Sequence, residues 1–221
     1  MEPRLDPVEI RVIGSLIEKQ VTTPEYYPLT LNGLVNACNQ TTNRSPVTSY
    51  DEGTVGRALL SLDRKGLLWT VQNSRVPKYG ERLKDKLNLD GSQLAAMCVL
   101  LLRGSQTPGE IRARTGRLHP FASLAEVESA LESMARAEPP LVRKLPRLPG
   151  TKEARFTHLL GEEVAGEEED AAAGELAMKP VAPETHPESD RISRLESEIE
   201  SLRQEFEELR RQVLESKVET G

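Results

Sequence analysis

The sequence has no apolar run of about 18 residues, the length that a membrane-spanning helix requires. Its first ten residues, MEPRLDPVEI, lack the basic and then apolar pattern of a secretory signal peptide. We therefore expect no membrane span and a cytoplasmic location.

Cysteine and histidine, on which many catalytic and metal sites depend, are also scarce. Cys38 and Cys98 lie in apolar helical patterns without a CxxC motif, so buried free thiols are expected in place of a disulfide or metal site. His119, His158 and His186 fall in a loop, at a strand end and in an acidic segment, and suggest no catalytic pairing. The motifs GxGxxG, GxxxxGK(S/T) and HExxH do not occur. We expect a protein that is not an enzyme and holds no cofactor or metal.

The net charge of −6 is distributed unevenly along the chain. Residues 161–190 carry ten acidic residues against one lysine, and residues 191–221 carry eight against six basic residues. Residues 1–160 carry 22 basic residues against 17 acidic ones, a charge of +5. A mildly basic body followed by an acidic tail permits contact with nucleic acid without requiring it.

The acidic segment 161–190 contains few large apolar side chains and three prolines. It cannot bury enough apolar surface to offset the entropy of ordering, so we predict a disordered linker. As a flexible chain it would have a root-mean-square span of roughly 30 Å.

Residues 191–218 show the clearest periodic pattern in the chain, with apolar residues in alternating steps of three and four, as in a coiled coil. In a parallel pair, the g and e positions would oppose residues of opposite charge. The pairs are Arg191–Glu196, Glu198–Arg203 and Glu205–Arg210. We predict a homodimer through a parallel C-terminal coiled coil; a single amphipathic helix folded back on the body is the alternative. The predicted interface residues are Ile192, Leu195, Ile199, Leu202, Phe206, Leu209 and Val213.

The body contains one pattern twice. In each copy a Thr-Pro pair follows an amphipathic segment, and an apolar stripe with offsets 0, 3, 4 and 7 comes later. The stripes are Val55, Ala58, Leu59 and Leu62 in the first copy, and Val127, Ala130, Leu131 and Met134 in the second. The first copy is 12 residues longer between the two features, which indicates duplication of one domain type and not a solenoid.

Each copy predicts three helices and a β-hairpin, with turn residues between the strands. In the first copy the helices are expected at about 6–20, 30–39 and 51–66, and the strands at 67–72 and 76–80. In the second copy the helices are expected at about 90–103, 107–115 and 123–136, and the strands at 141–146 and 154–159.

Three helices followed by a hairpin is the plan of the winged helix, a helix-turn-helix variant. The predicted fold is mainly α with small β-hairpins (α+β). It comprises tandem winged-helix domains at 1–86 and 87–160, the disordered acidic linker and the coiled-coil helix at 191–218.

The stretch VTTPEYYPLTLNGLVNACNQTTNR, residues 21–44, is the least regular part of the body. Pro24 and Pro28 favour extended backbone, and Thr30 can cap the second helix. We interpret the stretch as the connection into and out of that helix and expect its tyrosines to be partly buried.

Residues 5–55, which include the run EKQVTTPEYYPLTLNGLVNACNQTTNR, resemble the N-terminal signature of the YceH-like family of uncharacterised bacterial proteins. The resemblance continues through RALLSLDRKGLL and TPGEIRARTGRLHPF, so it covers nearly all of 1–160. It implies a pair of winged-helix domains with a variable C-terminal tail, and it implies no particular activity.

The fold plan and the basic body predict a non-enzymatic protein that binds double-stranded DNA, with transcriptional regulation as its possible role. In a winged helix the third helix enters the major groove, and basic hairpins contact phosphates or the minor groove. The predicted contacts are polar or basic residues of the first copy's third helix and preceding turn and of both hairpins. They are Arg44, Thr54, Arg57, Ser61, Arg64, Lys65, Arg75, Lys78, Arg143, Lys144, Arg147, Lys152 and Arg155.

Acidic residues favour an alternative. The third helix of the second copy carries Glu126, Glu128 and Glu132, which would repel phosphates, and the linker is acidic as well. The alternative is a dimeric winged-helix scaffold that binds other proteins without DNA contact, by fold-level analogy with chromosome-segregation accessory proteins.

Overall fold

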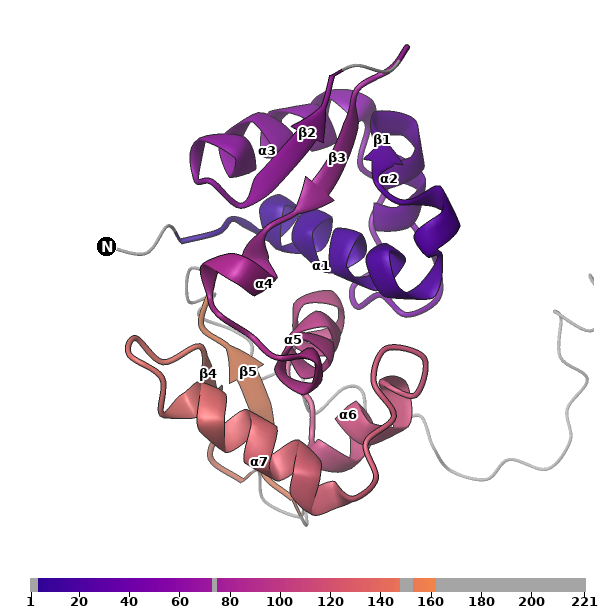
Figure 1. Cartoon of the computed structure of the whole chain (residues 1–221). Helices are drawn as coiled ribbons and strands as arrows, with labels where there is room; N and C mark the ends of the chain where they lie inside the picture. Colours follow the sequence, from indigo (N-terminus) through magenta and orange to yellow (C-terminus); the bar gives the residue numbers. More distant parts are fainter. Residues whose placement is uncertain (1–3, 73–74, 148–152, 162–221) are drawn as a thin grey trace, which may run out of the picture. The chain divides into compact units, whose positions relative to one another are not determined.

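The computed structural model describes residues 4–72, 75–147 and 153–161. These residues belong to one compact unit of helices and small antiparallel sheets (Figure 1), in agreement with the predicted α+β class. The predicted linker beyond Gly161 and the coiled-coil helix lie outside the described residues. No helix in the described part of the chain is long and apolar enough to cross a membrane.

The first half contains three helices and a three-stranded sheet. The helices are α1 (Pro7–Thr22), α2 (Leu31–Cys38) and α3 (Glu52–Arg64), and a 3-10 turn η1 (Pro24–Tyr26) follows α1. The strands β1 (Leu29–Thr30), β2 (Leu68–Val71) and β3 (Lys78–Glu81) pair antiparallel in the order β1-β3-β2. The three helices and the β2–β3 hairpin lie where the sequence predicts them, whereas β1 is an additional strand.

Local side-chain chemistry explains where these helices begin and end. The Asp6 carboxylate accepts the backbone N–H of Glu9, and the Glu9 carboxylate accepts that of Asp6, which forms a capping box at α1. Thr30 and Asp51 cap α2 and α3 through their side-chain oxygens, and each such cap stabilises its helix by about 1 kcal/mol. After α3, Gly66 adopts a φ of +69°, a left-handed conformation that favours glycine.

The second half repeats the order of three helices and a hairpin. A short helix α4 (Leu83–Lys86) leads to α5 (Gly91–Arg103), α6 (Pro108–Arg114) and α7 (Leu124–Ala135). Strands β4 (Val142–Lys144) and β5 (Phe156–His158) then pair antiparallel. Capping side chains begin all three longer helices: Asp90, Thr107 and Ser123. The sequence predicted these three helices and the hairpin, but not α4.

Helices α1 and α5 pack directly against each other and join the two halves. A β-carbon placed on Gly14 of α1 would lie 2.8 Å from Leu102 Cδ2 and 3.2 Å from Leu101 Cβ, so the helices approach at a position where no side chain fits. The backbone also crosses between the halves, because Leu5 N–H donates to the Leu160 carbonyl and Ser45 N–H donates to the Leu102 carbonyl. The domain boundaries at 86 and 87 stay a prediction, because the apolar core continues through both halves.

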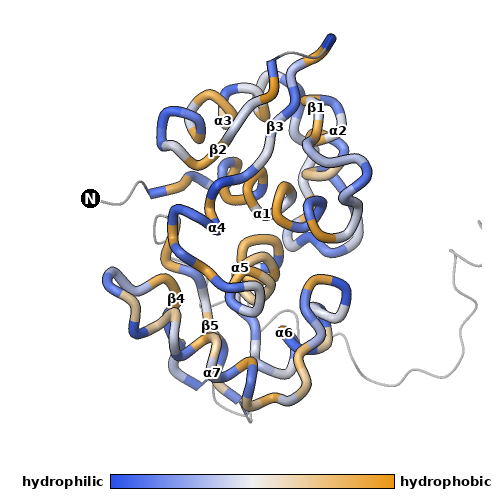
Figure 2. Tube along the Cα trace, in the orientation of Figure 1, coloured by the Kyte–Doolittle hydropathy of each residue, from blue (hydrophilic) through white to orange (hydrophobic). Residues whose placement is uncertain are grey.

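The hydrophobic interior is centred on α5, whose residues from Leu94 to Leu102 are all buried. Figure 2 shows this helix as a largely hydrophobic segment inside the body. The stripes on α3 (Val55, Ala58, Leu59, Leu62) and α7 (Val127, Ala130, Leu131, Met134) are buried as the repeated pattern predicts. A helix that is apolar all round must lie inside the molecule, which explains why α5 contacts both halves.

The packing at Gly14 predicts opposite effects for two glycine substitutions. We expect Gly14→Val to lower the free energy of unfolding by about 2 kcal/mol or more, because added atoms would overpack the α1–α5 contact. Gly56→Ala in α3, whose β-carbon would meet no atom within 4 Å, should raise it by up to about 1 kcal/mol through helix propensity. Urea unfolding of both variants measures this, and equal effects would contradict a tight α1–α5 contact.

Candidate functional site

The irregular stretch after α1 folds around a few polar side chains. Asn39 ends α2, and its amide donates to the Tyr50 carbonyl while its oxygen accepts the Tyr50 N–H and the Thr48 hydroxyl. Asn39 therefore closes the loop between α2 and α3 at both ends. Tyr27 is half-buried, and its hydroxyl accepts the backbone N–H of Glu81, whereas Tyr26 is exposed. The stretch connects α1, α2 and α3, as the sequence analysis interpreted it, and the expected partial burial is confirmed for Tyr27 and wrong for Tyr26.

Arg44, one of the predicted DNA contacts, is buried instead. Its side chain is 0% exposed, and its Nη2 lies 2.7 Å from Glu18 Oε2 and 2.8 Å from the Ala37 carbonyl. The guanidinium also donates to Glu18 Oε1, Gln40 and the Asn43 carbonyl. The prediction was wrong for Arg44, because a fully paired guanidinium inside the body cannot reach a duplex.

A second buried guanidinium belongs to the same polar cluster. Arg11 of α1 donates to the carbonyls of Cys38 and Pro46, at 3.3 and 2.7 Å. Ser15 of α1 donates to the Ala37 carbonyl. The last carbonyls of α2 would otherwise be buried without hydrogen-bond partners, and these donors satisfy them.

Ser61 of α3 and Lys65, which follows the helix, also turn inward and are not free to contact DNA. The Lys65 ammonium lies 2.6 Å from Glu9 Oε2 and donates to the Arg4 carbonyl, and Ser61 hydrogen-bonds to Glu9. Burial by itself would raise the pKa of the Glu9 carboxyl, but hydrogen bonds from Lys65, the Asp6 backbone and Ser61 lower it below the ordinary value. The Lys65–Glu9 ion pair connects α1 to the end of α3. The prediction of DNA contacts was therefore wrong for Lys65 and Ser61.

Only some of the basic residues that were predicted to contact DNA from the β4–β5 hairpin are exposed. Arg155 is half-buried, and its guanidinium donates to Glu110 Oε2 at 2.9 Å and to the Ser105 carbonyl, which corrects its assignment as a DNA contact. Arg143, Lys144 and Arg147 are exposed on this hairpin, with Lys144 over the Phe156 ring. Lys152 lies outside the described residues, as do the predicted interface residues from Ile192 to Val213.

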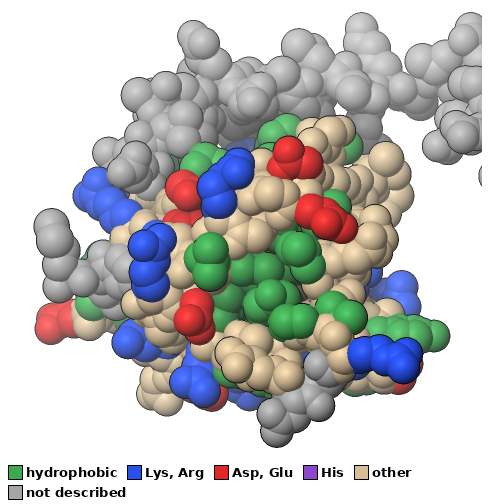
Figure 3. Space-filling model, turned by 90° about the horizontal axis from the view of Figure 1, so that it is seen from above, with side chains coloured by type: hydrophobic (Ala, Val, Ile, Leu, Met, Phe, Trp, Pro, Cys, Tyr) green, Lys and Arg blue, Asp and Glu red, His purple; other side chains and the backbone are tan. Residues whose placement is uncertain are grey.

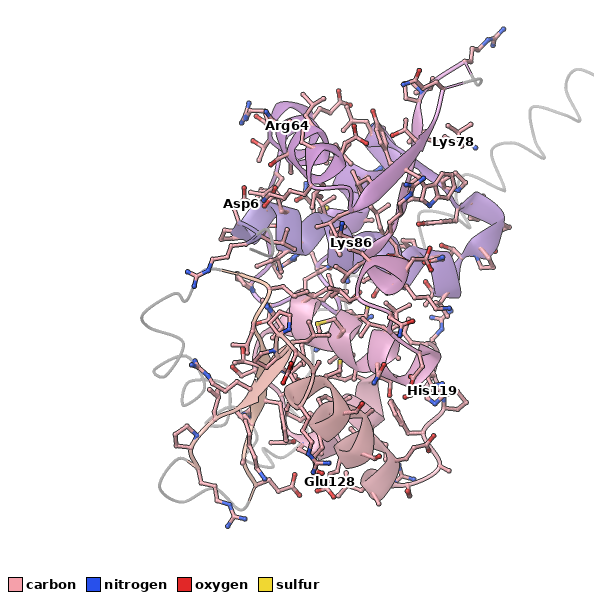
Figure 4. All side chains as sticks on the ribbon, turned by 60° about the vertical axis from the view of Figure 1, so that its left-hand side comes forward. Asp6, Arg64, Lys78, Lys86, His119 and Glu128 are labelled. Carbon is pink, nitrogen blue, oxygen red and sulfur yellow. The ribbon has the colours of Figure 1, made fainter. Side chains whose placement is uncertain are left out.

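The remaining predicted contacts gather on α3 and the β2–β3 hairpin. Arg57, Arg64 and Arg75 are exposed, and Lys78 is partly exposed. Thr54 accepts a hydrogen bond from Arg57 at 3.0 Å. Figure 4 shows Arg64 and Lys78 on this part of the body and Glu128 on α7 in the other half.

Between α3 and the hairpin lies a hollow of about 440 Å³. Its lining residues come from both elements: Gly56, Leu59, Leu60, Asp63, Thr70, Gln72, Pro77 and Tyr79. Leu60 is 67% exposed at its edge, and Val76 of the hairpin is 50% exposed. Figure 3 shows hydrophobic side chains gathered in the centre of the face seen from above, with basic and acidic side chains around them.

Sequence reasoning missed Leu60, although a signal was present. The buried stripe of α3 consists of Val55, Ala58, Leu59 and Leu62. Leu60 falls outside these offsets, so the periodicity itself places a large apolar side chain on the solvent side of the helix.

Two cysteines and two histidines, Cys38, Cys98, His119 and His158, lie in the part of the chain that the structure describes. Burial raises the pKa of both the Cys38 and the Cys98 thiols, the opposite of what a nucleophilic thiolate needs. Burial lowers the pKa of His158 to about 4. His119 lies 3.5 Å from Glu126 at the start of α7. Among the described residues no group of three His, Cys, Asp or Glu side chains is placed to hold a metal.

This α+β chain is a member of an uncharacterised bacterial protein family. It belongs to the family described as "Protein of unknown function, DUF480", which matches residues 5–151. A UPF0502 protein of Geotalea uraniireducens is 51% identical to it over 220 residues, which cover 98% of each chain. A UPF0502 protein of Opitutus terrae is 49% identical over 204 residues, covering 91% of this chain and 84% of that one. The sequence-based assignment to a family of uncharacterised bacterial proteins is therefore confirmed.

The buried pair at Arg44 predicts a large loss of stability on substitution. Arg44→Gln would leave the mostly buried carboxylate of Glu18 without its partner and would remove a donor from the Ala37 and Asn43 carbonyls, so the free energy of unfolding should fall by about 3–5 kcal/mol. The matched control is Arg57→Gln on the exposed face of α3, which should change it by less than about 0.5 kcal/mol. Urea unfolding measures both, and similar small losses would show that Arg44 is not a structural residue.

The buried imidazole of His158 predicts a pH dependence of stability. Its folded pKa of about 4 lies below the ordinary value of 6.5, so the folded state favours the neutral ring. Its contribution is complete above pH 6.5 and is lost as the pH falls through about 4, because the unfolded chain binds the proton first. We expect His158→Gln to remove roughly 1–3 kcal/mol of the stability difference between pH 7 and pH 4.5. Urea unfolding at both pH values tests this, and an unchanged difference would contradict it.

Proposed function

We propose that the chain is a non-enzymatic binding protein with two winged-helix modules, and that its first module binds a protein partner through α3 and the β2–β3 hairpin. The observation that carries this proposal is the hollow beside the exposed Leu60. The proposal includes a cytoplasmic location and dimerisation through residues 191–218, as the sequence predicts.

The composition of the face supports a protein partner. Leu59, Leu60 and Pro77 supply apolar surface to its lining and Asp63 an acidic group, and Arg57 and Arg64 are exposed on the same helix. An apolar centre with a polar rim is the usual arrangement in protein–protein interfaces. Exposed apolar patches on a folded domain also mark such interfaces, because covering them with a partner removes them from water.

The positions of the charges indicate what the partner presents. Leu60 lies between Arg57 and Arg64 on α3, three and four residues away, so the three side chains share one face. A complementary partner would place an apolar side chain in the hollow and carboxylates beside the two guanidiniums. An amphipathic helix with acidic residues beside its apolar stripe fits this description.

Double-stranded DNA is the second candidate, and the basic side chains around the hollow favour it. Arg57, Arg64, Arg75 and Lys78 could contact phosphates or bases if α3 entered a major groove. Against it stand Glu52 and Asp63 on the same helix. The two hairpins also extend from different halves of the body and do not lie side by side (Figure 1), so they do not form one basic face.

Leu60→Asp tests the proposed function. We expect it to reduce recovery of the partner with the tagged, full-length chain by about tenfold or more, because a carboxylate in the apolar centre would be desolvated and would repel acidic side chains. The melting temperature should not change, since Leu60 is 67% exposed. Val47→Asp is the matched control, because Val47 is 55% exposed and is not among the residues that line the hollow. Quantitative mass spectrometry of the recovered proteins from bacterial cells measures the ratio.

A mobility-shift titration with mixed-sequence duplex separates the second candidate from the first. If the intact chain shifts DNA at low salt, and Arg57→Gln with Arg64→Gln abolishes the shift while Leu60→Asp leaves protein recovery unchanged, DNA is the partner. Equal recovery of every protein by the wild type and by Leu60→Asp would end the proposal of a protein partner at this face.

A further inference from the structure

A second cavity, of about 470 Å³, lies on another part of the molecule, at the junction of the two halves. The first half contributes the end of α1 and the loop after α2, and the second half contributes α5, α6 and the turn that follows α6. Its volume is within the range of small-molecule sites, about 300–1,000 Å³. The cavity includes part of the irregular stretch 21–44, which the binding face on α3 does not use.

Four basic side chains line this cavity: Lys19, Arg103, Arg114 and Arg117. The carboxylate of Glu18 is the one acidic group among the described lining residues, and it is paired with Arg44 in a two-pronged contact. Lys19 lies farther from the same carboxylate, at 3.9 Å, so Glu18 is shared with the more closely held Arg44 and offsets only part of the charge of the four cations.

The partners of these cations leave most of their charge uncompensated. Arg103 hydrogen-bonds to the neutral side chain of Asn43. Arg114 lies 3.7 Å from Glu110, but Arg155 holds the same carboxylate more closely, at 2.9 Å. Among the described residues, Arg117 forms no ion pair. Burial, and then the charges of Arg114 and Arg44, lower the pKa of Arg103, while the carboxylates of Glu18 and Glu110 raise it in part.

Stabilisation of helix ends accounts for only part of this charge. Lys19, Arg103 and Arg114 stand in the last turns of α1, α5 and α6, where cations offset the negative end of the helix dipole. Each helix end is equivalent to roughly half a negative charge, so three of them supply about −1.5 against four full positive charges. The helix ends therefore offset less than half of the positive charge, and the remainder favours an anionic ligand.

The cavity also contains groups that recognise the rest of a ligand. Gln40, Thr42 and Asn43 bring amide and hydroxyl groups to the lining. Val99, Leu102 and Leu118 supply apolar surface to it. A site with convergent cations, a few neutral hydrogen-bonding groups and an apolar wall suits an organic molecule with one strongly anionic end.

We propose that this cavity binds a small organic phosphate, with the phosphate held by Arg103, Arg114, Arg117 and Lys19. Guanidinium groups match the geometry of phosphate oxygens and bind them through two parallel hydrogen bonds, and a phosphate monoester carries about two negative charges at neutral pH. Because both halves contribute cations, the bound phosphate links α1 to α5 and α6. The assignment is independent of the partner at the α3 face.

The experiment is isothermal titration of the full chain with inorganic phosphate and with adenosine monophosphate, at low ionic strength. We expect one saturable site for each probe, with the nucleotide bound more tightly because it also covers the apolar wall. Arg117→Gln and Arg114→Gln should each weaken binding by about tenfold or more, since each removes a charge-assisted contact. Arg136→Gln, whose side chain is 77% exposed on the far end of α7, is the matched control and should stay within about twofold.

Arg117 is exposed and Arg114 is nearly so, so both variants are expected to fold, and a thermal melt of each checks this. Three results would overturn the proposal. One is no saturable binding of either probe. Another is equal weakening by Arg136→Gln, which would show nonspecific attraction. The third is unaltered binding by a chain that carries both Arg114→Gln and Arg117→Gln. If the double variant instead loses affinity only for duplex DNA, these cations belong to a nucleic-acid surface and the small-molecule assignment fails.

Discussion

The first half of the body depends on the hydrogen bonds and the ion pair of the buried Arg44 guanidinium. It joins Glu18 of α1 to the Ala37 carbonyl at the end of α2, and it belongs to the loop that leads to α3. A loop without regular hydrogen bonding brings unpaired polar groups inside the protein, and each would cost free energy if left unsatisfied. Arg44 and Arg11 supply the missing donors, and the adjacent Ser45 N–H extends the connection to α5 through the Leu102 carbonyl. The loop after the irregular stretch therefore adds a second connection between the halves beside the α1–α5 contact.

Most of the fold could be predicted from the sequence because its determinants are local. The stripes on α3 and α7 recur at offsets of 0, 3, 4 and 7, and Asp6, Thr30 and Thr107 are side chains that cap helices within three residues of themselves. Strand β1 could not be predicted, since two residues carry no alternation and pair with β3 some 50 positions later. The α1–α5 contact could not be predicted from the sequence either. Nothing near Gly14 in the sequence indicates that Leu102 will lie against it.

The candidate site was predicted less well, and the reason is physical. The sequence does not show whether a basic residue faces solvent, binds a phosphate or pairs with a carboxylate far along the chain. Lys65 pairs with Glu9, which lies 56 residues away in the sequence, and Arg155 pairs with Glu110, which lies 45 residues away in the sequence. Only the tertiary structure reveals such pairs. Leu60 was different, because its place outside the stripe of α3 is visible in the sequence alone.

The charge of +5 on the body is therefore not the property of one surface. Part of it is consumed internally, as at Arg44, where charge serves packing and cannot attract a partner from solution. Part surrounds the hollow at α3, where Arg57, Arg64, Arg75 and Lys78 are offset in part by Glu52 and Asp63. The densest uncompensated part lies in the junction cavity. A long-range field that steers a polyanion requires charges of one sign over a wide face. Cations that gather around one hollow select a small ligand, because their attractions add at short range. The distribution of charge, and not its sum, thus separates the two surfaces of this protein and favours different partners for each.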